Sequence, residues 1–280
     1  MTQPRHAVST ESGRFYTNIP GFENLSLGSV TNIVGVKSKP AIPGWAAKLA
    51  GERAIKHEDR WHAIQQEEGD EAARKWISAA SREEMNYKAA MGSAIHLAAE
   101  VLDTEVTDSG FSGPLIERLD GVLAKHGGAS GDNLNRVWLH VIQYREFIRE
   151  CGVQFVERER TVFNPDDGWA GTLDAIVNVP DDKGALRRYV MDIKTGGVYA
   201  DSNALQLSAY RHATYVVDGN ASKPFSHQIH GGFVLQLKPK SYKVYFMRCD
   251  DAVYRRFLAA RDLWLWSTDE HKGACGDEWR

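Results

Sequence analysis

Two charged residues in the second half of the chain are spaced so that their side chains could act together on a phosphate ester. Asp192 and Lys194 stand at i and i+2 of the segment Met191-Asp192-Ile193-Lys194, whose alternation predicts a strand. Side chains at i and i+2 of a strand share one face, so the carboxylate and the ammonium point the same way. Taken alone, such a pair could equally be an exposed ion pair.

A second carboxylate, Asp174, interrupts the otherwise apolar segment Gly171-Thr172-Leu173-Asp174-Ala175-Ile176-Val177, which is also predicted to be a strand. Two neighbouring carboxylates provide the hard oxygen ligands that suit Mg²⁺ or Mn²⁺. Such an ion polarises a phosphoryl oxygen and lowers the pKa of a bound water, and Lys194 could orient that water or stabilise the developing charge. The pattern therefore favours phosphodiester hydrolysis.

Two earlier segments offer further ligands. Glu157 and Glu159 share one face of a predicted strand, and either could supply a carboxylate; the alternative is an ordinary polar strand face. Gly92, His96 and Glu100 fall on one face of a predicted helix. The His96 imidazole could complete a metal site or contact phosphate, or it could be a packed core histidine.

Gln206 and Tyr210 stand at i and i+4 of a later helical segment, so both side chains project from the same face. Their amide and phenol groups could hydrogen-bond a scissile phosphate or hold the metal ligands. The alternative is the ordinary surface and core of an amphipathic helix.

The elements that would position these residues change character along the chain. Helical spacing is predicted for residues 42–100, 114–125, 133–150, 203–217 and 250–266, and strands for residues 153–162, 170–179, 188–194, 232–237 and 243–247. We expect a flexible N-terminal arm over residues 1–24 and a single domain over residues 25–280. Its residues 25–150 are mainly helical, and residues 151–270 form an α/β core with a mixed central sheet flanked by helices.

Composition limits the alternatives. The 280 residues are 42% hydrophobic, which is enough for a core, and no apolar run or N-terminal segment resembles a membrane span or signal peptide. We therefore expect a soluble, cytoplasmic protein. The net charge of −3 gives no global attraction to a polyanion, so nucleic-acid binding would need local basic surfaces. Candidates are Arg145, Arg149, Arg158 and Arg160, and Lys238, Lys240, Lys243 and Arg248.

In this order, the Gly-x-x-x-His helix, the glutamate strand, Gly-Thr-Leu-Asp, Asp-Ile-Lys-Thr-Gly and Gln-x-x-x-Tyr resemble the PD-(D/E)XK nuclease superfamily, specifically its RecB-like exonuclease branch. The resemblance extends to the segments Ser29–Ile33 and Pro43–Ala47, which are similar to phage-type members, and covers the chain from about residue 25 to 266. It implies a restriction-endonuclease-like core.

The resemblance also implies roles for individual residues. Asp174, Asp192, the backbone carbonyl of Ile193 and the metal-proximal histidine His96 would bind the ion, and Lys194 would be the catalytic lysine. Glu159 fits the branch's strand glutamate better than Glu157, although Glu157 stays open. Gln206 and Tyr210 would handle the substrate.

Two departures exclude other kinds of relative. Some members hold an iron–sulfur cluster on four cysteines, but this chain has three widely separated ones, Cys151, Cys249 and Cys275, so we expect no cluster. No Walker A pattern is present, so we expect no bound nucleotide and no helicase activity.

The sequence thus favours a Mg²⁺- or Mn²⁺-dependent DNA nuclease, with exonuclease action in recombination, repair or phage DNA metabolism. A phage-encoded protein would act in the host cytoplasm. A single-strand annealing protein or another recombination factor is a plausible partner, as is a second copy of the chain in a homo-oligomer. The alternatives are a catalytically silent DNA-binding or assembly module with the same fold, and a hydrolase of small phosphate esters. Aromatic side chains such as Trp169 or Tyr199 could stack on an unpaired DNA end.

Overall fold

The computed structural model describes residues 5–11, 13–37, 39–124, 131–271 and 274–276, and its chain divides into two compact units. One unit, which we call the sheet unit, comprises residues 1–37, 99–102 and 138–280. The other, the helical unit, comprises residues 38–98 and 103–137. The residues predicted to form the mainly helical part, 25–150, thus contribute to both units.

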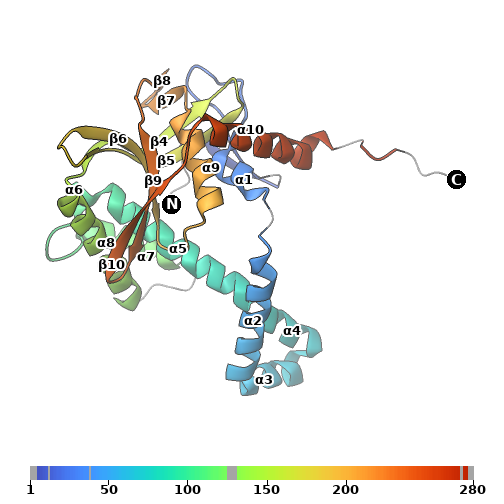
Figure 1. Cartoon of the computed structure of the whole chain (residues 1–280). Coiled ribbons are helices and arrows are strands. Elements are labelled where there is room, and N and C mark those ends of the chain that lie inside the picture. The colour runs from blue at the N-terminus through green and yellow to red at the C-terminus, as the bar shows by residue number, and fades with distance from the viewer. Residues whose placement is uncertain (1–4, 12, 38, 125–130, 272–273, 277–280) are drawn as a thin grey trace. The chain divides into compact units, whose positions relative to one another are not determined.

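The sheet unit contains a ten-stranded mixed sheet (Figure 1). Its strands are β1 (Ala7–Thr10), β2 (Gly13–Tyr16), β3 (Leu27–Ser29), β4 (Gln154–Asn164), β5 (Trp169–Pro180), β6 (Leu186–Lys194), β7 (Tyr215–Asp218), β8 (Ala221–Pro224), β9 (Gly231–Lys238) and β10 (Ser241–Met247). Most pairs are antiparallel, whereas β3 with β5 and β6 with β9 are parallel. The predicted mixed sheet flanked by helices is confirmed.

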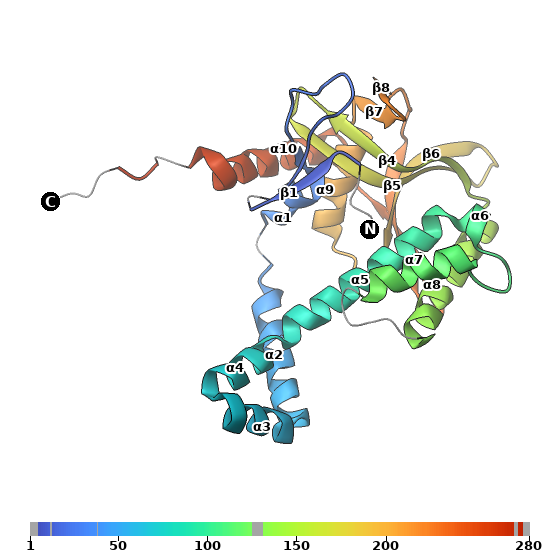
Figure 2. The same ribbon diagram turned by 180° about the vertical axis from the view of Figure 1, so that it is seen from behind.

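Three helices pack on one face of this sheet: α1 (Val30–Gly35), α9 (Ala200–Arg211) and α10 (Asp251–Leu265), which a short π-helical turn, Trp266–Glu270, extends. Both views place them side by side (Figures 1 and 2). Their apolar residues form one core with the strands, in which Leu207, Phe257 and Trp264 meet Leu173 and Val190. On the opposite face, the Phe147 ring of α8 (Gly131–Glu150) packs edge-on against Phe233 of β9. Cover on both faces explains why β5 is apolar along most of its length.

Trp169, which opens β5, belongs to this core. Its ring is fully buried, and its Nε1 donates to the Tyr254 hydroxyl at 2.9 Å. A buried ring cannot stack on DNA, so Trp169 is a structural residue.

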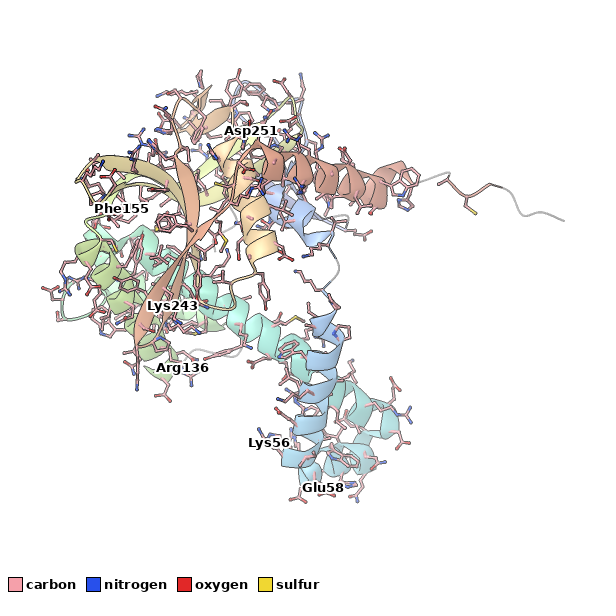
Figure 3. All side chains as sticks on the ribbon, viewed as in Figure 1. Lys56, Glu58, Arg136, Phe155, Lys243 and Asp251 are labelled. Atoms are coloured by element: carbon pink, nitrogen blue, oxygen red, sulfur yellow. The ribbon has the colours of Figure 1, made fainter. Side chains whose placement is uncertain are left out.

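The helical unit contains α2 (Ala41–Lys56), α3 (Glu58–Glu68), α4 (Asp70–Ser78), most of α5 (Ala80–Glu100) and of α6 (Leu102–Glu105), α7 (Gly113–Ala124) and the start of α8. Figure 3 shows Lys56 and Glu58 at the corner between α2 and α3. Arg53 ties this corner to α4, since it donates to the Trp76 carbonyl at 2.9 Å and stacks over the Trp76 ring. Leu115, Leu119 and Leu123 form the buried stripe of α7 at helical spacing.

Most predicted elements agree with the structure to within a few residues, but one helix was predicted too long. α9 ends at Arg211, and residues 215–217 form strand β7 instead, with Val216 opposite Val162 of β4. Tyr215, Val216 and Val217 favour strands, and pairing with β4 outweighs the helical spacing that led into them. Residues 7–10 and 13–16, within the predicted arm, form a hairpin that joins the sheet through β3. Lys125, the end of one predicted helix, lies outside the described residues.

None of the helices in the described part of the chain combines the length and the apolar character needed to cross a membrane.

Candidate metal centre

The Asp192 carboxylate and the Lys194 ammonium meet on β6, as the period of a strand predicts. The Nζ atom of Lys194 lies 2.7 Å from both carboxylate oxygens. Asp192 is only 2% exposed, whereas about a third of the Lys194 side chain reaches solvent. Burial lowers the pKa of Lys194, but the nearby carboxylates of Asp192 and Asp174 outweigh it, and the pKa is raised overall. Lys194 is therefore a cation that donates hydrogen bonds.

Asp174 lies where β5 and β6 separate. The two strands pair from Pro180↔Leu186 as far as Ala175↔Met191, and the next pair in this register would be Asp174 and Asp192. Instead of continuing the ladder, the Asp174 side chain accepts the Ile193 backbone N–H on Oδ2 at 2.6 Å. Where the two strands separate, the carboxylates of Asp174 and Asp192 thus lie at the same level of the sheet.

Glu159 lies on the other side of Asp174. In the β4–β5 register, Arg158 faces Ala175 and Arg160 faces Leu173, which puts Glu159 opposite Asp174. A carboxylate oxygen of each lies within 4.8 Å of the other. Glu159 has a positive φ of 48°, a left-handed backbone that a glutamate adopts only at a cost. Such local strain commonly occurs at functional sites.

Glu157, the other candidate on β4, has different partners. Its carboxylate accepts a hydrogen bond from Arg160 Nε at 2.7 Å, and its other oxygen lies 3.7 Å from His227 Nε2. A bulge between Phe155 and Glu157 shifts the register of the strand beforehand. These contacts favour Glu159 as the carboxylate beside Asp174.

Gln206 and Tyr210 both lie on the face of α9 that packs against the sheet. The Nε2 atom of Gln206 donates to Asp192 Oδ1 at 2.9 Å. The Tyr210 hydroxyl donates to the backbone carbonyl of Thr172 at 3.0 Å, and burial raises its pKa well above the ordinary range. The ring lies so close to Gly171 that a methyl there would meet it at 2.7 Å, which explains a glycine beside Thr172.

His96 lies on α5, half-buried in the helical unit. The same helix continues without a break into residues 99–100, which belong to the sheet unit that holds the three carboxylates. His96 is thus one helical turn from the point where α5 enters the sheet unit.

Two residues that support the centre through hydrogen bonds, Gln236 and Tyr16, were not predicted from the sequence. Gln236, opposite Lys194 on β9, donates to the Gly196 carbonyl at 2.6 Å and so holds the loop that follows Lys194. The buried Tyr16 hydroxyl lies 3.2 Å from Thr172 Oγ1. No local motif indicates either contact, because one depends on parallel pairing and the other on a strand far away in sequence.

The donor set fits a hard divalent cation. Glu159, Asp174 and Asp192 supply carboxylate oxygens from neighbouring positions on three adjacent strands, which is the chemistry that Mg²⁺ and Mn²⁺ prefer. Two of the cysteines have different environments, since Cys249 is buried and Cys275 is exposed.

The chain matches no protein-family model and no curated protein sequence. Among solved structures it has a partial likeness to LHK-Exo in complex with dAMP, with 13% identity and a TM-score of 0.32 over 68% of this chain and 95% of that one. A second likeness, to SSO0001, has 12% identity and a TM-score of 0.30 over 70% of this chain and 97% of that one. Both TM-scores are low, so the function proposed below rests on the residues of this chain.

Proposed function

We propose that the protein is a divalent-metal-dependent DNA nuclease that hydrolyses phosphodiester bonds, with exonuclease action. One observation supports this above all: Glu159, Asp174 and Asp192 stand at one level of three adjacent strands, with the Lys194 ammonium beside them. Carboxylate oxygens that lie this close together are suited to share a divalent cation. The proximity of the Glu159 and Asp174 oxygens, within 4.8 Å of each other, therefore supports a bound metal ion.

In this proposal Asp174, Asp192, Glu159 and the Ile193 carbonyl bind the ion, and His96 completes the set. The ion would be Mg²⁺ or Mn²⁺, without an iron–sulfur cluster or a bound nucleotide. His96 is included because of its Gly-x-x-x-His helix, which takes its place in the order of motifs in the sequence. A neutral imidazole is a good ligand for a transition ion such as Mn²⁺.

When bound, the ion would polarise the scissile phosphate and activate a water molecule. The protein's own groups have separate tasks. The Lys194 ammonium, held by Asp192, stabilises the negative charge that grows on the phosphate oxygens as the water attacks. Gln206 fixes the orientation of Asp192 from behind. The role of Gln206 and Tyr210 in substrate handling stays a prediction, whereas their hydrogen bonds support a positioning role.

DNA is the proposed partner, in recombination, repair or phage DNA metabolism in the cytoplasm. This rests on the PD-(D/E)XK-like order of motifs in the sequence. A single-strand annealing protein and a homo-oligomeric assembly are further proposals that follow from the same resemblance.

Degradation of linear and closed circular DNA, with Mg²⁺, Mn²⁺ or EDTA, tests the proposal. We expect metal-dependent loss of linear DNA, with the circle spared. Asp192→Asn and Lys194→Ala should each lower the rate by about a hundredfold or more, since each removes a group that acts on the transition state. The matched controls, Asp182→Asn and Lys183→Ala, change the same residue types in the β5–β6 turn and should cut normally.

Cleavage of the circle would indicate endonuclease action, and cleavage in EDTA would contradict the metal centre. If the protein binds DNA but cuts nothing under any condition, it is the silent binding module. The Glu159, Asp174, Asp192 and Lys194 set argues against that alternative.

A further inference from the structure

Tyr199 is an exposed aromatic residue on the segment that joins β6, the strand of Asp192 and Lys194, to α9. It immediately precedes α9, the helix whose Gln206 holds Asp192, and follows Lys194 by five residues. Its side chain is 68% exposed, the second-largest exposure among the large apolar residues of the described chain. At this exposure most of the ring is open to a ligand from solvent.

The Tyr199 ring packs against the backbone of Gly197. A methyl carbon added at Gly197 would lie 3.1 Å from the Tyr199 ring and from its hydroxyl oxygen. The ring therefore packs closely on the bare backbone of Gly197, and a larger residue there would press on it. One part of the ring is thus supported, and the remainder stays open to solvent.

The base of the side chain is also held. The backbone N–H of Tyr199 donates to Oδ1 of Asn203 at 2.9 Å, and Asn203 is buried. The loop before it is fixed by Gln236, which donates to the Gly196 carbonyl. A ring on a rigid backbone loses little conformational freedom when it binds a flat partner, so it is preorganised.

The spacing between Tyr199 and Gln206 suits a nearby nucleotide. Gln206, which donates to Asp192, comes seven positions after Tyr199, which is about 10 Å along the axis of α9. That length corresponds to roughly three stacked nucleotides of one strand. Every base has a flat face that can stack on an aromatic ring, and one such contact contributes about 1–3 kcal/mol without regard to sequence.

We propose that Tyr199 is a stacking platform for an unpaired nucleobase a few nucleotides from the scissile phosphate. This rests on the proposed nuclease function and deepens it, because it makes a frayed or single-stranded end the substrate. A base-paired end has no free base to offer, so Tyr199 would favour DNA whose end is unpaired.

Fluorescence of 2-aminopurine tests the contact directly, because stacking on an aromatic ring quenches it. We would scan the fluorophore through the first four positions of a single-stranded oligonucleotide bound to the Asp192→Asn protein in Mg²⁺. We expect quenching at one position, retained in Tyr199→Phe and lost in Tyr199→Ala, with about tenfold weaker binding in the latter. Gly197→Ala, whose methyl would press on the ring, should give an intermediate signal. Tyr245→Ala, which removes another exposed tyrosine on β10, is the matched control and should behave as the parent.

Equal quenching and affinity with and without the Tyr199 ring would overturn the platform. Hydrolysis by the otherwise unaltered enzyme separates the two proposals. If single-stranded ends are cut with a KM that Tyr199→Ala raises by about tenfold, the platform is supported. If cutting is normal and Tyr199→Ala changes nothing, only the platform fails; if no DNA is cut or bound, the nuclease proposal fails and the platform with it.

Discussion

At the scale of single residues, Glu159 combines a carboxylate that faces Asp174 with a left-handed backbone. A left-handed backbone costs a residue other than glycine about 1–2 kcal/mol, which a purely structural strand position has no reason to retain. Glu157, two residues earlier, has an ion pair with Arg160. Of the two glutamates of β4, Glu159 is therefore the candidate for function, and Glu157 contributes to stability.

We predict that Glu159→Gly abolishes metal-dependent cleavage but lowers the free energy of unfolding less than Glu157→Gly does. Glycine adopts the positive φ of position 159 freely, whereas at position 157 it removes an ion pair and weakens a strand. Cleavage rates and urea unfolding of the two variants, measured side by side, check this. Retained activity in Glu159→Gly, or its loss in Glu157→Gly alone, would reassign the carboxylate.

At the scale of elements, α10 begins at a well-defined cap. Asp250 accepts the Val253 N–H at 3.1 Å, and Arg248 donates to its carboxylate. Hydrogen bonding from Arg248 first, and from the backbone N–H of Val253 second, lowers the pKa of Asp250 from its ordinary value of 3.8. Because the folded pKa is depressed, the stabilisation is present above about pH 4 and is lost as the pH falls below it.

We therefore predict that Arg248→Ala destabilises the protein slightly at pH 7 and that the difference from the parent shrinks as the pH falls below about 4. The pair is exposed, so salt should also reduce the difference. Denaturant unfolding of both proteins across pH measures it. A difference that stays constant at low pH would mean that Arg248 acts through packing.

Strand β3 and helix α10 meet at Gly28, where a methyl carbon would lie 2.5 Å from the buried Trp264 ring. We predict that Gly28→Ala lowers the free energy of unfolding by about 1–3 kcal/mol, because the ring has to move out of a close-packed core. The control Gly35→Ala, at the end of α1, has no atom near the added methyl and should be tolerated. Thermal unfolding distinguishes them; equal stabilities would mean that Trp264 adapts easily.

How far the sequence predicted this arrangement depends on the range of the interactions. The alternation in β6 predicted that Asp192 and Lys194 share a face, because that depends only on strand geometry. It could not predict that β5 and β6 separate at Asp174, that Glu159 takes a positive φ, or that β7 replaces the end of a helix. Each of these results from pairing with a segment distant in sequence. Strand geometry left Glu157 and Glu159 equivalent for the same reason, and only the resemblance favoured Glu159.

At the scale of the whole molecule, the net charge of −3 means that DNA binding has to rest on local cations. Of the predicted basic segments, Lys238, Lys240 and Lys243 are exposed around the β9–β10 turn, where Figure 3 shows Lys243. Arg160, by contrast, is engaged by Glu157. The β9–β10 turn is thus the better candidate for phosphate contacts.

We predict that the affinity for DNA falls at least tenfold between about 50 and 200 mM salt, with little dependence on sequence. Lys240→Ala and Lys243→Ala together should reduce the slope of log affinity against log salt by about one to two. Fluorescence anisotropy with unrelated oligonucleotides measures both quantities. An affinity independent of salt would contradict binding through phosphate contacts.

The central claim is that Glu159, Asp174 and Asp192 hold a divalent cation, and Mn²⁺ binding to the protein alone tests it most directly. Free Mn²⁺ is followed by its electron paramagnetic resonance signal during titration of the parent, Asp174→Asn, Asp192→Asn and the control Asp182→Asn. We predict that the parent and the control bind Mn²⁺ alike, and that each of the other two binds at least about tenfold more weakly. Equal Mn²⁺ binding by all four proteins would contradict the metal centre.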